Sequence, residues 1–279
     1  MQKTILITGS TDGIGLETAR VLVALGHHVL LHGRNPAKAA AAEKALAESA
    51  GGGHVEHFVA DLSRMTEVEA LAGAMSELPQ LDVLINNAGV YNTPAPRTAE
   101  GLDVRFAVNA IAPYLMTRRL AELLGPSGRV INLSSAAQSP VDPEALAGSV
   151  RLPDAAAYAQ SKLALTLWSR SLALALGDRG PAVIAVNPGS LLGTKMVQQA
   201  FGVAGGDVGI GAEILRRAAL TEEFAAASGQ YFDNDAGRFA APHPDALDQR
   251  KCQEVVRRIE GVLARLGHEV SPMTEYPAS

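Results

Sequence analysis

A tyrosine and a lysine in the second half of the chain have the spacing that proton transfer requires. Tyr158 and Lys162 stand four positions apart at the start of a segment with helical spacing, so their side chains share one face of a helix. A phenol titrates near pH 10 and is a poor base at neutral pH. An ammonium about 4 Å away would favour the phenolate by roughly 4 kcal/mol at an effective dielectric near 20, or about three pKa units. The pair therefore predicts a general acid or base, although such a pair also occurs by chance in ordinary helices.

Polar side chains elsewhere extend this prediction. Ser134 and Ser135 follow a short apolar run, and a hydroxyl at a strand end can hydrogen-bond a substrate oxygen as charge develops on it. Both hydroxyls could instead cap a turn, and the strand-end position favours Ser135 over Ser134 as the functional serine. Asn109 lies within a segment of helical spacing, where asparagine is an indifferent helix former, so we expect it to have a special role.

A glycine-rich turn near the N-terminus predicts a phosphate site. The sequence from Thr8 to Gly15 spaces three glycines as GxxxGxG between an apolar strand and a helix. Glycines let the backbone approach a pyrophosphate, and the N-terminus of the following helix favours an anion. The Ser10 and Thr11 hydroxyls could add contacts, whereas the Asp12 carboxylate would repel a phosphate if it pointed inward. A turn without a ligand is the alternative, but the strand–turn–helix context favours a nucleotide. The residues expected to bind it are Gly9, Ser10, Thr11, Gly13, Ile14 and Gly15.

The end of the second predicted strand indicates which nicotinamide cofactor binds. A site for NAD usually has Asp or Glu there, which accepts from the ribose 2′-hydroxyl. Here the sequence reads His32-Gly33-Arg34-Asn35, and the Arg34 guanidinium can bind a 2′-phosphate. We therefore favour NADP(H) over NAD(H), with a solvated loop arginine as the alternative. Asp61 and Leu62 follow the third strand, where a carboxylate could accept from the adenine amino group or cap the next helix.

The elements that would position these groups alternate along the chain. Short apolar runs predict strands, and segments with helical spacing predict helices between them. This alternation implies parallel strands with right-handed crossovers, and near-continuous apolar strands suit a sheet covered on both faces. We predict one α/β domain over residues 1–279, a doubly wound parallel sheet of the Rossmann type, with substrate loops at about 139–156 and 190–228. The predicted strands are 5–7, 28–32, 55–59, 81–86, 129–133, 182–186 and 229–232, and the predicted helices are 13–26, 36–49, 64–78, 100–124 with a kink at Pro113, and 156–176.

Together these motifs resemble the short-chain dehydrogenase/reductase family. The resemblance runs from residue 4 to about 200, in the family's order, through the glycine turn, Asn86-Asn87-Ala88-Gly89, Asn109, Ser135, the Tyr158 and Lys162 pair and Asn187-Pro188-Gly189. It implies that Tyr158 is the acid/base, and that Lys162 binds the nicotinamide ribose and tunes Tyr158. It also implies that Ser135 orients the substrate carbonyl and that Asn109 supports a water-linked proton relay.

The same resemblance implies further cofactor contacts and a branch of the family. Asn87, Ala88 and Gly89 would lie beside the cofactor, Pro188 and Gly189 would border the nicotinamide, and Thr194 would contact its carboxamide. Ser135 and Tyr158 stand 23 positions apart, further than in many relatives. The extra segment, about Val141 to Ala156, and the His-Gly-Arg-Asn step resemble the retinol-dehydrogenase-like and carbonyl-reductase-like branch. The segment could cover the substrate or obstruct the helix pairing that builds tetramers in many relatives.

Composition excludes several function classes. The chain has 279 residues, 47% of them hydrophobic, and a net charge of −5, which predicts a globular protein without the basic surface that nucleic acid or an anionic membrane requires. No apolar run approaches the roughly 18 residues of a membrane span, and no signal peptide is evident. The single cysteine, Cys252, suits a reducing compartment, so we predict a cytoplasmic protein. His54 and His57 have no third ligand nearby in the sequence, and Asp233 to Asp235 resembles a turn, so no metal site is predicted.

We therefore predict an NADP(H)-dependent oxidoreductase that transfers a hydride between the nicotinamide and a carbonyl or alcohol, as a monomer or homo-oligomer. A catalytically silent NADP(H) sensor or scaffold is the alternative, because a fold does not fix function. A lyase or epimerase of the extended branch would need a larger C-terminal domain and another glycine spacing. A set of candidate pocket residues indicates a small hydrophobic substrate. These are Val90, Tyr91, Gln138, Val141, Leu191, Leu192, Met196, Val197 and Phe201.

Overall fold

Eight strands form one sheet in the order β3-β2-β1-β4-β5-β6-β7-β8. Every neighbouring pair is parallel except β7 and β8. The strands are β1 (Thr4–Ile7), β2 (His28–Gly33), β3 (His54–Val59), β4 (Val83–Asn86), β5 (Arg129–Leu133), β6 (Ala182–Asn187), β7 (Tyr231–Asp233) and β8 (Arg238–Ala240). The order reverses between β1 and β4, and ligands of such sheets bind beyond the carboxyl ends of the strands at this point. The computed structural model describes residues 1–48 and 51–271, without the side chain of Phe201.

Helices connect the strands and cover the sheet. The longer ones are α1 (Gly13–Ala24), α2 (Pro36–Ala47), α3 (Met65–Met75), α5 (Ala112–Leu124), α7 (Asp154–Leu176), α9 (Val208–Leu220) and α11 (Gln249–Arg265). The shorter ones are α4 (Val104–Phe106), α6 (Pro143–Leu146), α8 (Lys195–Phe201), α10 (Glu222–Ala225) and the turns η1 (Ala107–Ile111), η2 (Gly177–Arg179) and η3 (Pro244–Leu247). Within the described residues, no helix is both long enough and apolar enough to cross a bilayer.

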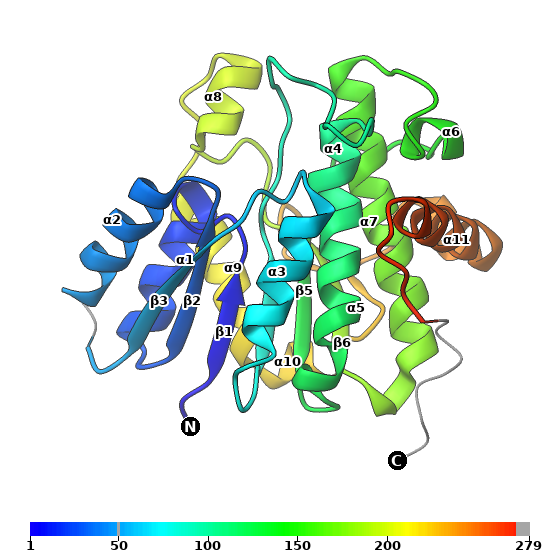
Figure 1. Ribbon diagram of the computed structural model, residues 1–279. Coiled ribbons are helices and arrows are strands. Elements are labelled where there is room, and N and C mark those ends of the chain that lie inside the picture. Colours follow the sequence, from blue (N-terminus) through cyan, green and yellow to red (C-terminus); the bar gives the residue numbers. More distant parts are fainter. Residues whose placement is uncertain (49–50, 272–279) are drawn as a thin grey trace.

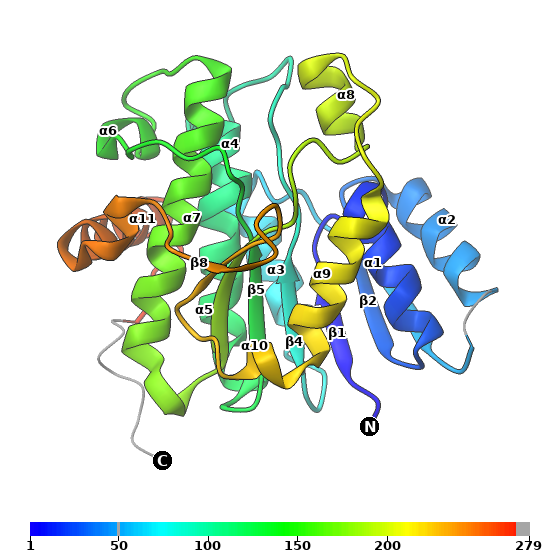
Figure 2. The ribbon, with the colours of Figure 1, turned by 180° about the vertical axis from the view of Figure 1, so that it is seen from behind.

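The core has one apolar layer on each face of the sheet. Successive side chains of a strand point to opposite faces, so Leu6 of β1 belongs to one cluster and Ile5 and Ile7 belong to the other. The first cluster joins the sheet to α3, α5 and α7, which Figure 1 shows in front. The second joins it to α1, α2 and α9, which are in front in Figure 2. Both faces are covered, which confirms the predicted single-domain, doubly wound α/β fold.

The helix predicted over residues 100–124 begins only at Val104 and contains an irregular turn. Glu100 instead accepts a hydrogen bond from the first N–H of α3, at 3.0 Å. Residues 107–111 form a π-helical turn, and α5 follows it. Pro113 has no N–H to donate to the carbonyl four residues earlier, which disfavours a regular helix here. An irregular π-turn therefore stands just before Pro113, where the sequence predicts a kink.

The second half of the chain contains elements that the sequence analysis missed, namely α6, α8, α9, α10 and β8. Four of these elements have seven residues or fewer and carry little periodic signal, whereas α9 has 13 residues and was missed within the loop predicted over 190–228. The helix predicted from Ala156 starts at Asp154, and the strand predicted over 229–232 is β7. The predicted end of the second helix, at Ser49, lies outside the described residues. The segment around Cys252 is helical as expected, and burial raises the pKa of this thiol to about 11.

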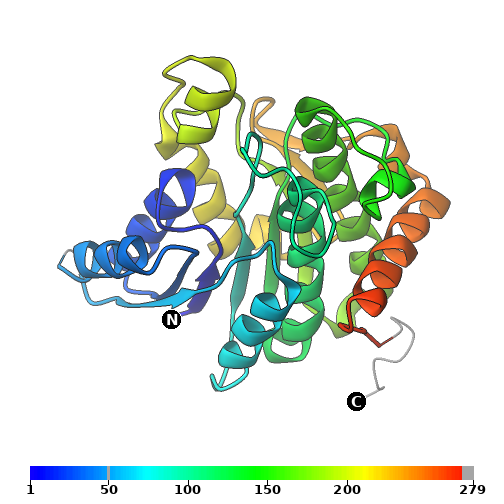
Figure 3. The ribbon, with the colours of Figure 1, turned by 45° about the horizontal axis from the view of Figure 1, so that its top comes forward.

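The carboxyl ends of the strands form one rim of the molecule. Figure 3 brings this rim forward and shows α8 and the segment between β4 and α4 gathered over it. The glycine turn after β1 and the N-terminal part of α7 reach the same rim (Figure 1). The fold therefore brings the predicted cofactor turn and the predicted tyrosine–lysine pair to one edge of the sheet.

Candidate active site

A cavity of about 550 Å³ opens at this rim, beside the point where the strand order reverses. Its walls come from the glycine turn, the ends of β2 and β3, the segment after β4, the start of α7, and α8. The predicted site residues that line it are Gly9, Thr11, Gly13, Ile14, Arg34, Asp61, Leu62, Asn87, Ala88, Gly89, Tyr158, Lys162, Pro188 and Thr194. Within the described chain, the predicted residues Ser10, Gly15, Asn109, Ser135 and Gly189 are outside this lining.

The glycine turn depends on the conformational freedom of its first glycine. Gly9 has φ of +65°, and a Cβ on it would lie 2.8 Å from the Cα of Ala88, so a larger residue would be both strained and in collision. Asp12 accepts a hydrogen bond from the Gly13 N–H at 2.9 Å and caps α1. The same carboxylate forms an ion pair with Lys195 of α8. The charge that we expected to repel a phosphate is therefore compensated by a cation.

The Ser10 side chain is part of the sheet and not of the cavity. Its hydroxyl is fully buried, donates to the Ile7 carbonyl at 2.9 Å and accepts from the His32 N–H at 2.9 Å. This corrects the expectation of a hydroxyl contact with a phosphate, because the group would have to break both bonds. Gly15 is also a packing residue, since a Cβ there would lie 2.4 Å from the Asn87 Nδ2 and 2.5 Å from the Gly9 carbonyl oxygen.

Asn87 ties the glycine turn to the segment after β4. Its Nδ2 donates to the carbonyl oxygens of Thr8 and Gly9, at 2.8 and 2.9 Å. The Thr8 hydroxyl accepts in return from the N–H groups of Asn87 and Ala88, each at 3.1 Å. These bonds set the separation of two opposite cavity walls.

His32 is a supporting residue that the sequence analysis did not single out. The Gly9 N–H donates to its Nδ1 at 3.1 Å, and its Nε2 lies 3.0 Å from the Ala60 carbonyl oxygen. Because Nδ1 accepts, the proton belongs on Nε2, which donates to Ala60. Burial lowers the pKa of His32 to about 4, so the ring is neutral at physiological pH and links the glycine turn to the end of β3.

The far end of the cavity carries Arg34 and Asp61. Arg34 is exposed where β2 ends. The Asp61 Oδ1 accepts from the Ser63 N–H at 3.0 Å, and α3 begins only at Met65 with Arg64 at its cap position. Asp61 therefore holds the turn before α3 without occupying the N-cap position, and it still borders the cavity.

Tyr158 and Ser135 meet at the other end. Burial raises the pKa of Tyr158, and the Tyr91 phenol raises it further. A hydrogen bond that the Tyr158 oxygen accepts from the Ser135 side chain acts in the opposite direction. The Tyr91 ring packs on the Tyr158 ring with centroids 4.7 Å apart. The Tyr158 phenol is therefore protonated at neutral pH in the protein without cofactor.

Lys162 shares the helix face of Tyr158 but does not lower the pKa of the phenol here. Its Nζ donates to the Leu133 carbonyl at 2.7 Å and lies 5.7 Å from the Tyr158 ring centroid. Burial lowers the pKa of Lys162 to about 8. The expected lowering of the tyrosine pKa by about three units is thus not found, because the ammonium is directed at a carbonyl and burial of the phenol dominates.

The two serines after β5 have different surroundings. The Ser134 hydroxyl is buried against α7, 2.8 Å from the Thr166 hydroxyl and 3.4 Å from the Lys162 carbonyl. The Ser135 hydroxyl accepts from the Ala137 N–H at 3.1 Å and reaches Tyr158. Ser134, and not Ser135, is among the residues that line the cavity. The Ser134 hydroxyl is nevertheless engaged with Thr166 and the Lys162 carbonyl, so Ser135 beside the lining stays the candidate for a substrate contact.

Asn109 fixes the segment after β4 to α7 from within the π-turn. Its Oδ1 accepts from the Val90 N–H at 2.8 Å, and its Nδ2 donates to the Val90 carbonyl at 3.0 Å and to the Ser161 hydroxyl at 2.9 Å. The side chain is only 1% exposed. A direct role of this side chain in a proton relay would require it to break those bonds, so its special role in this structure is to position the walls.

Polar contacts from the turn between β7 and β8 hold the loop after β6. Asn187 donates from Nδ2 to Asp233 and to Asp235, each at 2.9 Å. The Ser190 N–H and hydroxyl donate to Asp235 at 2.8 and 2.5 Å. The predicted turn at Asp233 to Asp235 is confirmed, and its carboxylates serve to shape the loop that carries Pro188.

The two predicted substrate loops differ in their placement. The second loop lines the cavity with four residues, Thr194, Lys195, Met196 and Gln199. The Thr194 hydroxyl also caps α8 by accepting a hydrogen bond from the Val197 N–H at 3.3 Å. Residues 139–156 contribute no lining residue. Instead α6 lies beside α11, where Glu144 pairs with Arg258. Among the predicted pocket residues, Val90, Tyr91 and Met196 line the cavity.

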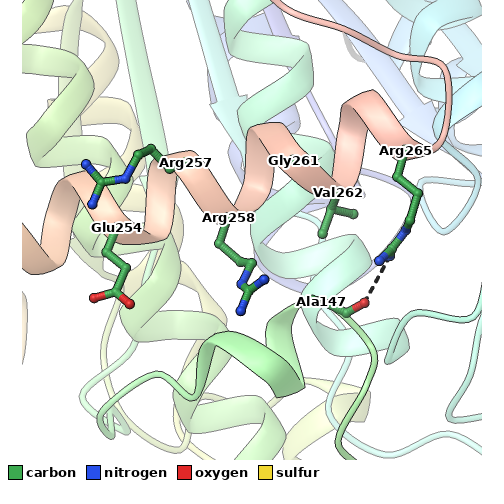
Figure 4. A pocket seen from close by; sticks show the side chains of 7 residues that line it. All are labelled: Ala147, Glu254, Arg257, Arg258, Gly261, Val262 and Arg265. Atoms are coloured by element: carbon green, nitrogen blue, oxygen red, sulfur yellow. Dashed lines mark hydrogen bonds between the residues drawn. The ribbon is translucent and has the colours of Figure 1, made fainter.

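A second cavity, of about 410 Å³, lies between α6 and α11 (Figure 4). Arg265 donates to the Ala147 carbonyl at 2.9 Å, and Arg258 pairs with Glu144. The remaining lining residues offer neither a glycine turn nor an acid–base pair with a hydroxyl neighbour. The chemistry that the sequence predicts is therefore concentrated at the rim of the sheet.

Comparisons with known proteins agree with this geometry. The family model for short chain dehydrogenase matches residues 3–202. The chain is 33% identical to retinol dehydrogenase 13 of Homo sapiens, over 99% of this chain and 88% of the relative. It superimposes with a TM-score of 0.78 and 25% identity on the crystal structure of an uncharacterized protein from Mycobacterium paratuberculosis, covering 97% of this chain and 96% of the other. A short chain dehydrogenase from Burkholderia cenocepacia in complex with NADP gives a TM-score of 0.66 and 26% identity over 83% of this chain and 95% of the other. The chain belongs to the short-chain dehydrogenase/reductase family, on its retinol-dehydrogenase-like branch, and is an NAD(P)-dependent oxidoreductase.

Proposed function

We propose that the protein reduces a hydrophobic aldehyde or ketone with NADPH, or oxidises the corresponding alcohol with NADP⁺, with Tyr158 as the acid/base. The observation that carries this proposal is the hydrogen-bonded pair of Tyr158 and Ser135 beside a cavity that also holds the glycine turn. The buried ammonium of Lys162 donates to the carbonyl of Leu133 at the end of β5. A proton donor, a second hydroxyl and a cation close to one another support the proposal.

The residues of the cavity fit a nicotinamide dinucleotide. Gly9 and Gly13 both have positive φ and leave open backbone at the N-terminus of α1, where a pyrophosphate is favoured. Lys162 has three donors, and in the described chain its Nζ has one acceptor, the Leu133 carbonyl, so it retains donors for ribose hydroxyls. A bound nicotinamide supplies or accepts the hydride.

The proton chemistry belongs to the side chains of this protein. In reduction, the Tyr158 hydroxyl gives its proton to the substrate oxygen, and the Ser135 hydroxyl donates a hydrogen bond to the same oxygen. The raised pKa of Tyr158 keeps the phenol protonated and suits it to this direction. The Lys162 Nζ, 5.7 Å from the Tyr158 ring centroid, is a cation close to the phenolate that remains. In oxidation, the same groups act in the reverse order.

Arg34 supports the choice of NADP(H) over NAD(H). Its guanidinium borders the cavity at the end of β2, where an NAD site would present a carboxylate. An always-charged planar guanidinium matches a phosphate. The neighbour from Burkholderia cenocepacia is described in complex with NADP, which agrees with the proposal.

The substrate that we propose is a retinol-like isoprenoid alcohol or its aldehyde. The relative from Homo sapiens is named a retinol dehydrogenase. Val90, Tyr91 and Met196 give the cavity near Tyr158 an apolar wall, which suits a hydrocarbon chain. Pro94 and Val108 extend this wall on the side of α4.

Replacing Tyr158 with Phe tests the proposal. The variant keeps the ring that packs on Tyr91 and loses the proton donor, so we expect turnover of all-trans-retinal with NADPH to fall at least a thousandfold. NADPH binding, followed by nucleotide fluorescence, should stay within about twofold of wild type. Turnover close to wild type in Tyr158→Phe would refute the mechanism. Tight NADPH binding by wild type without turnover of a panel of carbonyl compounds would favour the sensor instead.

A further inference from the structure

Two histidines and a glutamate meet at the end of the sheet opposite the cofactor cavity. The Nε2 of His28 lies 2.9 Å from Oε1 of Glu56, and the Nε2 of His54 lies 3.3 Å from the same oxygen. The ligand atoms of all three residues lie within 4.8 Å of one another. The two imidazole rings are tilted with centroids 4.8 Å apart. Two ring nitrogens are therefore directed at one carboxylate oxygen.

The register of β2 and β3 creates this cluster. His28 pairs directly with His54, and Leu30 pairs with Glu56. Side chains alternate between faces along a strand, so His54 and Glu56 share one face of the edge strand β3, together with His28 of β2. His57 lies on the other face, where it pairs with Glu43 of α2. The backbones that carry the three ligands are fixed by six residue pairs of parallel sheet.

The geometry points to a binding site for a divalent transition-metal ion, with Zn²⁺ as the ion that its ligand set suits best. Zinc binds histidine nitrogens and carboxylate oxygens at about 2.0 to 2.2 Å in a tetrahedron, which separates adjacent ligand atoms by about 3.3 Å. The contact of His54 with Glu56, at 3.3 Å, equals that edge, the contact of His28 with Glu56 is shorter at 2.9 Å, and all three ligand atoms lie within 4.8 Å of one another. The His54 side chain is 65% exposed, so solvent can supply the fourth ligand.

The position of the site gives it a structural role. His32, four residues along β2 from His28, borders the cofactor cavity, so the two sites are roughly 13 Å apart at 3.3 Å per residue. An ion held by His28, His54 and Glu56 would join the edge strand β3 to β2 and act on stability. It would not touch the atoms that react at Tyr158.

Zinc titration of tag-free, chelator-treated full-length protein tests this proposal. We expect saturable binding of one Zn²⁺ per chain by calorimetry. We also expect a rise in Tm of about 5 °C when free zinc is roughly a hundredfold above its Kd. The variants His54→Ala and Glu56→Gln should each weaken zinc binding at least about tenfold, because each removes one of three protein ligands. Both residues are partly exposed, and the Tm measured without zinc shows whether each variant is folded.

His57→Ala is the matched control, since it removes a histidine from the same strand on the opposite face. We expect it to keep zinc affinity within about twofold of wild type. The proposal is overturned if wild type shows no saturable binding at one ion per chain. It is equally overturned if neither His54→Ala nor Glu56→Gln weakens binding, or if His57→Ala weakens it as much as they do.

Discussion

Arg34 is the residue whose replacement should change the cofactor preference. Its guanidinium is exposed, borders the cavity and has no acidic partner within the described residues. A charge-assisted hydrogen bond to a phosphate contributes about 1.5 to 3 kcal/mol, and exposure places this contact at the low end because solvent screens it. We therefore expect Arg34→Ala to raise the Kd for NADPH about tenfold to thirtyfold. The Kd for NADH, which lacks the 2′-phosphate, should change less than about twofold.

Fluorescence titration of both nucleotides against wild type and variant measures the two constants. Arg20→Ala is a suitable control, because this replacement removes the same charge. Arg20 is an exposed arginine of α1 that pairs with Glu17. The variant should leave the Kd for NADPH within about twofold. If Arg34→Ala weakens NADH and NADPH equally, or if Arg20→Ala weakens NADPH as strongly, the guanidinium of Arg34 does not contact the 2′-phosphate and the reasoning fails.

Three further perturbations probe the site and its support. Ser135→Ala should lower kcat about a hundredfold or more with little change in Tm. Ser134→Ala should cost about 1 kcal/mol in urea unfolding, because it removes the hydrogen bond to the Thr166 hydroxyl while Thr166 keeps its bond to the Lys162 carbonyl; the reverse pattern would reassign the functional serine. Burial lowers the pKa of Lys162 to about 8, so kcat/KM should fall as pH rises above about 8 and the ammonium is lost. The unfolded lysine stays charged to about pH 10.5, so between pH 8 and pH 10.5 the unfolded chain binds one more proton than the folded protein, and the free energy of unfolding should rise with pH there. A kcat/KM profile that is flat to pH 10 would contradict the role of the Lys162 ammonium in catalysis. Arg105→Met should lower the free energy of urea unfolding by roughly 3 kcal/mol. Arg105 is 1% exposed and lies 2.7 Å from the carboxylate of Asp103, which would remain without its cation. A decrease in the free energy of unfolding below about 1 kcal/mol would show that the pair is dispensable.

Local spacing was sufficient to predict the parts of the site that depend on neighbouring residues. The glycine turn follows directly from the strand and helix on either side, and the four-residue spacing of Tyr158 and Lys162 places both on the cavity side of α7. The strands at the centre of the sheet were predictable because they are buried on both faces. The cytoplasmic location and the monomeric or homo-oligomeric state stay predictions.

The parts that were not predictable depend on contacts between distant segments. The pKa of Tyr158 is raised because burial outweighs the hydrogen bond with Ser135, and burial follows from packing of the whole rim. The ion pair of Asp12 with Lys195 joins residues 183 positions apart. The cluster of His28, His54 and Glu56 exists only in one register of β2 and β3, which spacing along the chain does not reveal.

Most polar side chains around the cavity are held in fixed positions by the scaffold, and this restricts the chemistry to a few groups. Asn109, Asn87 and Ser134 each make two or more hydrogen bonds to other parts of the chain. Turning any of them toward a substrate would leave buried partners unsatisfied, at about 1 to 3 kcal/mol for each group. Tyr158 and Ser135 pair mainly with one another, so a substrate oxygen that replaces this mutual contact disturbs little else. The buried amides therefore fix the walls, and proton transfer is left to Tyr158, which lines the cavity, with Ser135 beside it.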